Sequence, residues 1–67
     1  LSRLGALKVA LQGERRGFEF YYAVAGTAKD PKIQAVAKEF VGEEREHVET
    51  LKRWIEREEA ALRAVPV

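Results

Sequence analysis

The sequence has no cysteine, a single histidine and only two prolines in 67 residues. The lack of cysteine excludes disulfides, thiol redox chemistry and thiolate metal sites, and it agrees with a reducing compartment, so we expect a cytoplasmic protein. No apolar run is long enough to span a bilayer, and no signal-peptide pattern is present. Basic and acidic residues nearly balance, with 12 Lys and Arg against 11 Asp and Glu, so neither nucleic acid nor a membrane is an expected partner.

A chain of this length forms at most one small domain, which we expect to cover residues 1–67. Such a short chain buries a small fraction of its surface and needs further stabilisation. Because disulfides are excluded, two sources of stability remain. They are self-association and a metal ion held by oxygen and nitrogen ligands.

Apolar residues recur every three or four positions along two segments. This pattern predicts helices at about 3–26 and about 31–63, joined by a turn at about 27–30. Ser2 is expected to cap the first helix at its start and Gly26 to cap it at its end. Asp30 followed by Pro31 is typical of the start of a second helix. The short connection makes the expected fold all-α, an antiparallel two-helix hairpin.

The hairpin has more large apolar residues than one partner helix covers. We therefore expect a two-fold homodimer, or a higher oligomer, in which two hairpins form a four-helix bundle. The residues that need further neighbours are Leu11, Phe18, Phe20, Phe40, Leu51 and Trp54.

Three ionisable residues lie on the apolar stripes of the two helices. Glu14 is on the stripe of the first helix, and Glu44 and His47, three residues apart, are on the stripe of the second. Glu14 lies 15 residues before position 29 and Glu44 lies 15 residues after it. At the rise of an α-helix both lie about 20 Å from the turn, so an antiparallel hairpin places them at the same height.

A carboxylate buried without a partner is costly, because it must be protonated or paired. A two-fold dimer brings together four glutamates and two histidines, and two divalent cations balance the four carboxylates. One Glu from each of two helices, with Glu-x-x-His from each of the other two, is the ligand pattern of di-iron and di-manganese carboxylate bundles. Glu14, Glu44 and His47 are therefore the expected metal ligands, with two iron ions per dimer and manganese as the alternative. We expect no catalytic residue beyond these ligands.

The segments "ALQGERRGFEFYYAVAG" and "DPKIQAVAKEFVGEEREHVETLKRWI" resemble the rubrerythrin branch of the ferritin-like superfamily. The matching features are Glu14, the Asp30–Pro31 turn, and Glu44 with His47. In having one helix pair instead of two, the sequence is similar to the encapsulated-ferritin type, whose iron site lies between subunits. The resemblance implies a ferritin-like bundle that binds Fe²⁺ and oxidises it with O₂ or peroxide, in iron handling or protection from oxidative stress.

Two alternatives remain open. The chain is either a metal-free helical hairpin that serves oligomerisation or docking, or half of a longer rubrerythrin-like protein whose other half supplies ligands. A location inside a protein nanocompartment is the alternative to free cytoplasm, but no recognisable cargo tail follows residue 63.

Five further residues near the three ligands have expected roles. Tyr21, two turns after Glu14, is a candidate hydrogen-bond donor to a ligand carboxylate or a packing residue. Glu43 and Glu46 point elsewhere on the second helix and are expected to be solvated. The glycines at positions 17 and 42 lie inside helices near the height of the site, where they either admit a close approach or are merely tolerated.

Overall fold

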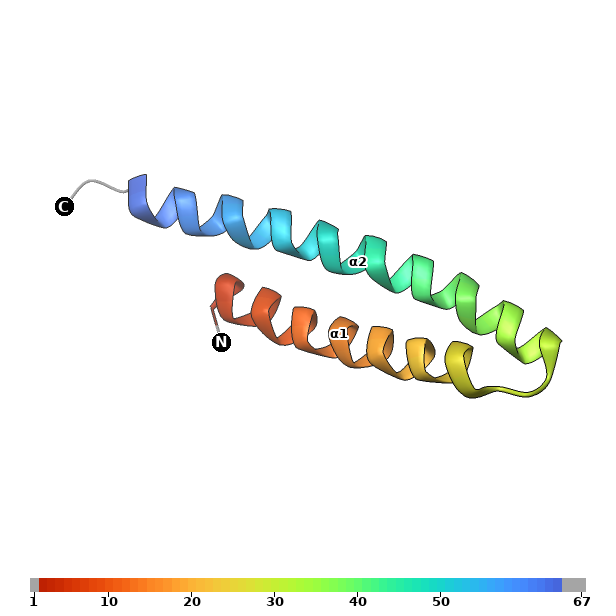
Figure 1. The fold of residues 1–67 in the computed structure, drawn as a ribbon. Helices are drawn as coiled ribbons and strands as arrows, with labels where there is room; N and C mark the ends of the chain where they lie inside the picture. Colours follow the sequence, from red (N-terminus) through yellow and green to blue (C-terminus); the bar gives the residue numbers. More distant parts are fainter. Residues whose placement is uncertain (1, 65–67) are drawn as a thin grey trace.

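The fold is known from a computed structural model that describes residues 2–64, so the ends of the expected 1–67 domain lie outside the described residues. It consists of helix α1, Arg3–Thr27, and helix α2, Pro31–Ala64, which run antiparallel beside each other (Figure 1). No strand is present in this part of the chain. The predicted all-α antiparallel hairpin is confirmed.

The start of α1 is capped as the sequence predicts. The Ser2 hydroxyl accepts a hydrogen bond of 2.9 Å from the backbone N–H of Gly5. The Ser2 carbonyl accepts the first helical bond, 2.8 Å long, from Ala6. The hydroxyl bond satisfies the N–H of Gly5, one of the N–H groups of the first turn that have no partner within the helix.

The end of α1 differs from the prediction, which placed the cap at Gly26. The helix continues to Thr27, and Ala28 forms the cap with an extended backbone, at φ −65° and ψ 131°. Its N–H donates to the carbonyl of Val24 at 2.8 Å. Because the chain leaves the helix through an extended residue, no left-handed glycine is required there.

Asp30 starts α2 as predicted. Its carboxylate accepts a 2.8 Å hydrogen bond from the N–H of Lys32, and its carbonyl accepts a 2.9 Å bond from the N–H of Gln34. Pro31 occupies the first helical position, where a missing N–H has no cost. The tight connection places the two helices directly beside each other.

The hairpin buries little of itself. The molecule measures 58 × 18 × 12 Å, and the only buried apolar residues in the described part are Ala37, Leu51 and Ile55, of which Leu51 and Ile55 are still 9% exposed. Near the turn the rings of Tyr21 and Phe40 pack with their centroids 4.9 Å apart. A core of this size is small even for a short domain, so most of the apolar surface remains available for a partner.

An exposed stripe runs along α2 at intervals of seven residues, or nearly two turns. It consists of Ile33, Phe40, His47 and Trp54, which we call the open stripe. Its three apolar side chains are 53%, 38% and 49% exposed, respectively. Beside its first two members lies a shallow apolar groove that is also lined by Phe20, Tyr21, Val24 and Val36. A sustained spacing of seven is typical of a helix face that packs on another helix.

Within residues 2–64, neither helix has an apolar stretch of the length and hydropathy needed to cross a membrane.

Candidate metal centre

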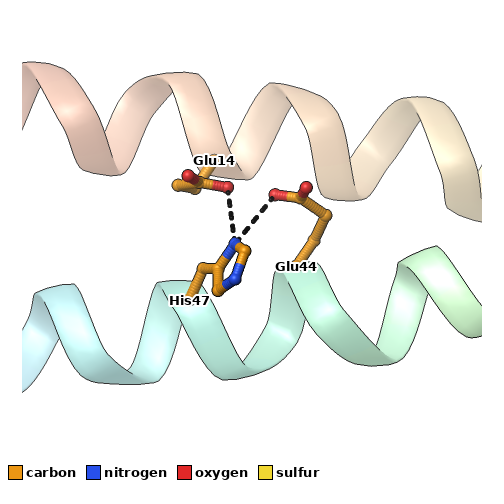
Figure 2. A group of neighbouring side chains, drawn as sticks. All are labelled: Glu14, Glu44 and His47. Atoms are coloured by element: carbon orange, nitrogen blue, oxygen red, sulfur yellow. Dashed lines mark hydrogen bonds and ion pairs between the residues drawn. The ribbon is translucent and has the colours of Figure 1, made fainter.

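The two helices bring the three predicted ligands together. Glu14 extends from α1, while Glu44 and His47 extend from successive turns of α2, and all three side chains point into the space between the helices (Figure 2). One ligand atom from each residue lies within 4.8 Å of the other two. The equal height expected from the helical rise therefore leads to a cluster in space.

One imidazole nitrogen faces both carboxylates. The Nδ1 atom of His47 lies 3.4 Å from Oε2 of Glu14 and 4.0 Å from Oε2 of Glu44, as the dashed lines in Figure 2 show. Two atoms bound to one metal at roughly 2.0–2.2 Å lie at most about 4.4 Å apart. Both distances to Nδ1 are within this limit, and the two carboxylate oxygens lie within 4.8 Å of each other. A small approach of the carboxylates would therefore let one divalent cation bind all three side chains.

The cluster is half-buried and opens to one side. The side chains of Glu44, Glu14 and His47 are 20%, 33% and 57% exposed, respectively. His47 is the most exposed of the three, because it lies on the open stripe between Phe40 and Trp54. A partner that packs on the apolar residues of this stripe would therefore also cover His47.

The two carboxyl groups perturb each other. Contact with Glu44 lowers the pKa of Glu14, and the neighbouring imidazole of His47 lowers it further, against the effect of burial. Contact with Glu14, followed by burial, raises the pKa of Glu44. As the pH rises, Glu14 ionises first, and Glu44 then ionises next to a negative charge that repels its own. A divalent cation would remove this repulsion.

Gly17 on α1 lies directly against the carboxylate of Glu44. A β-carbon placed at Gly17 would be 3.3 Å from Oε2 and 3.4 Å from Cδ of Glu44. A β-carbon at Gly42 would meet nothing within 4 Å. Of the two glycines that the sequence places near this height, only Gly17 admits a close approach.

The other residues near the site have the following positions. The ring of Tyr21 packs on Phe40 and, edge to face, on Phe20 at 5.3 Å, and its role as a donor to a ligand carboxylate stays a prediction. Glu43 and Glu46 are exposed, as predicted. Among residues 2–64, no second group of three acidic, histidine or cysteine side chains is placed to hold a metal.

The molecule is thus a helical hairpin that holds two carboxylates and an imidazole, with the spacing of metal ligands, between its helices. The family model described as Rubrerythrin matches residues 5–66, nearly the whole chain, and the chain belongs to the rubrerythrin family. Proteins of this family typically bind iron and are generally oligomeric. No curated protein and no solved structure matched the chain.

Proposed function

We propose that this rubrerythrin-family protein is a di-iron carboxylate protein that oxidises Fe²⁺ with O₂ or peroxide, with manganese as the alternative metal. The observation that carries the proposal is the convergence of Glu14, Glu44 and His47 within 4.8 Å on an open side of the hairpin. Two carboxylates and a neutral imidazole provide the hard ligands and the charge that suit Fe²⁺ or Mn²⁺.

We further propose that a second copy of the chain completes the site. One hairpin provides three ligand residues with a formal charge of −2, whereas a pair provides four carboxylates and two imidazoles for two divalent ions. The open stripe supports this arrangement, because its exposed apolar residues lie on both sides of His47 along α2. A two-fold axis near His47 would cover these residues and bring the two clusters together.

In the loaded protein, Glu14, Glu44 and Nδ1 of His47 would hold the metal, and the paired carboxylates would balance its charge. A pair of Fe²⁺ ions held there would supply two electrons, enough with two protons to reduce O₂ to H₂O₂. The chain's own contribution would be to hold the ions at neighbouring positions with side chains from both helices.

The test is iron-dependent consumption of O₂ by the purified protein. We expect the protein to bind about one iron per chain, and we expect Glu44→Ala and His47→Ala to abolish both binding and oxidation. Glu43→Ala is the matched control, because Glu43 is exposed and adjacent in sequence to Glu44 but outside the cluster. A double Glu44→Ala, His47→Ala variant that oxidises Fe²⁺ as fast as the parent would refute the assignment.

A further inference from the structure

We propose that Gly17 is a positioning residue for the metal site. In this role, the absence of a side chain at position 17 lets the carboxylate of Glu44 lie against α1, where it faces His47. The inference rests on the proposed function, since it concerns the same ligands, but it assigns a role to a residue that has no ligand atom of its own.

The Gly17 contact involves Oε2 of Glu44, the carboxylate oxygen that faces His47. The atom of Glu44 nearest to a β-carbon at Gly17 is Oε2, at 3.3 Å. The same Oε2 lies 4.0 Å from Nδ1 of His47. A side chain at position 17 therefore displaces the donor oxygen itself, rather than a distant part of the glutamate.

The displacement is large on the scale of metal coordination. An alanine at position 17 requires Glu44 to give way by a few tenths of an ångström. Metal–ligand distances in functional sites vary by only about 0.2 Å. Gly17 also follows Glu14 by three residues, or nearly one turn, so the carboxylate of Glu44 lies on the side of α1 from which Glu14 extends.

Gly42 provides a matched control within the same chain. It is an exposed helical glycine, and a β-carbon there meets nothing within 4 Å. It precedes Glu44 by two residues, which places it on a different side of α2. Replacing either glycine by alanine favours the helix, because glycine destabilises a helix interior. Only the replacement at position 17 should disturb the site.

The experiment compares Co²⁺ binding by the parent, Gly17→Ala and Gly42→Ala proteins, using the visible absorption of bound Co²⁺ as the readout. We expect Gly17→Ala to weaken Co²⁺ binding about tenfold or more, as changes that misplace a ligand commonly do. We also expect its absorption band to change in position and intensity, because ligand geometry determines both. Gly42→Ala should match the parent in affinity and spectrum. With chelator present, both variants should melt at or above the parent temperature.

The outcomes separate the two proposals. If the parent binds Co²⁺ and Gly17→Ala binds within twofold of Gly42→Ala with the same spectrum, the role of Gly17 is refuted and the metal site stands. If Gly17→Ala melts below the parent in chelator, its role is in helix packing and the positioning proposal is likewise refuted. If the parent binds no Co²⁺, the proposed function fails, and the role of Gly17 fails with it.

Discussion

Replacing Glu44 by glutamine should stabilise the metal-free protein and destabilise the metal-loaded one. Glutamine keeps the shape of the side chain and removes its charge. In the absence of metal, the substitution removes repulsion between two carboxylates whose oxygens lie within 4.8 Å. In the presence of metal, the same substitution removes an anionic ligand. The substitution should raise stability without metal and lower it with metal, and this reversal is expected only if the cluster is arranged around a cation.

The size of the metal-free effect follows from the geometry. Two unit charges roughly 5 Å apart repel by about 0.8 kcal/mol in water and by about 3 kcal/mol at the effective dielectric constant of a protein surface. Because the two side chains are 33% and 20% exposed, and salt screens exposed charges, we expect a gain of about 1 kcal/mol. For a domain of this size, such a gain raises the melting temperature by about 4–8 °C.

The assay is thermal melting followed by circular dichroism at one fixed chain concentration, with chelator or with Mn²⁺. In chelator, Glu44→Gln should melt about 4–8 °C above the parent. Mn²⁺ at about 100 times its Kd stabilises the parent by about 2.7 kcal/mol and should reverse the order. Glu43→Gln, the control, removes an exposed charge and should stay within about 0.5 kcal/mol of the parent in both conditions. The reasoning is refuted if Glu44→Gln lowers the melting temperature in chelator, or if Mn²⁺ stabilises the parent and the variant equally.

Two other predictions concern pH and self-association. The folded-state pKa of Glu44 is raised. The contribution of Glu44 to the stability of the folded protein is therefore fully present below its unfolded-state pKa, and it is lost as the pH rises through its folded-state pKa. The metal-free melting advantage of Glu44→Gln should therefore grow from about pH 4 to pH 8, and an advantage independent of pH would contradict this cause. Val36→Glu, in the apolar groove, should reduce the native mass from about twice to about once the 7.6 kDa of one chain. Tyr22→Lys, at an exposed ring outside that groove, should leave the dimer intact. A dimer that survives Val36→Glu would place the interface elsewhere.

The sequence predicts the hairpin well, because its signals are local. Ser2 and Asp30 can satisfy free N–H groups whatever the rest of the chain does, so their capping roles follow from residue type and position. The end of α1 was predicted incorrectly at Gly26. A glycine permits the left-handed backbone conformation that often ends a helix, but residue type does not show whether the turn uses that conformation. Here the C-cap is Ala28, with an extended backbone.

The cluster was predictable for a similar reason. Two straight helices joined by a tight turn make sequence distance from the turn a measure of height, so Glu14 and Glu44 were expected at similar heights. The different surroundings of the two helical glycines also agree with their spacing from the ligands. Gly17 is nearly one turn from Glu14, whereas Gly42 is only two residues from Glu44 and so lies on a different side of its helix.

Burial at the site could not be predicted from one chain. The stripe that includes His47 was expected to be buried, yet within a single hairpin its side chain is 57% exposed. Helical periodicity identifies a face that packs against something, but it does not separate contacts within a chain from contacts between chains. The neighbours of His47 in the open stripe, Phe40 and Trp54, are exposed for the same reason.

The most direct test is native mass spectrometry of the protein after anaerobic loading with Fe²⁺ and removal of unbound metal. The parent should be detected as two chains of 7.6 kDa with two iron ions, and the His47→Ala variant should contain no iron. A parent protein detected only as single chains without iron would contradict the account.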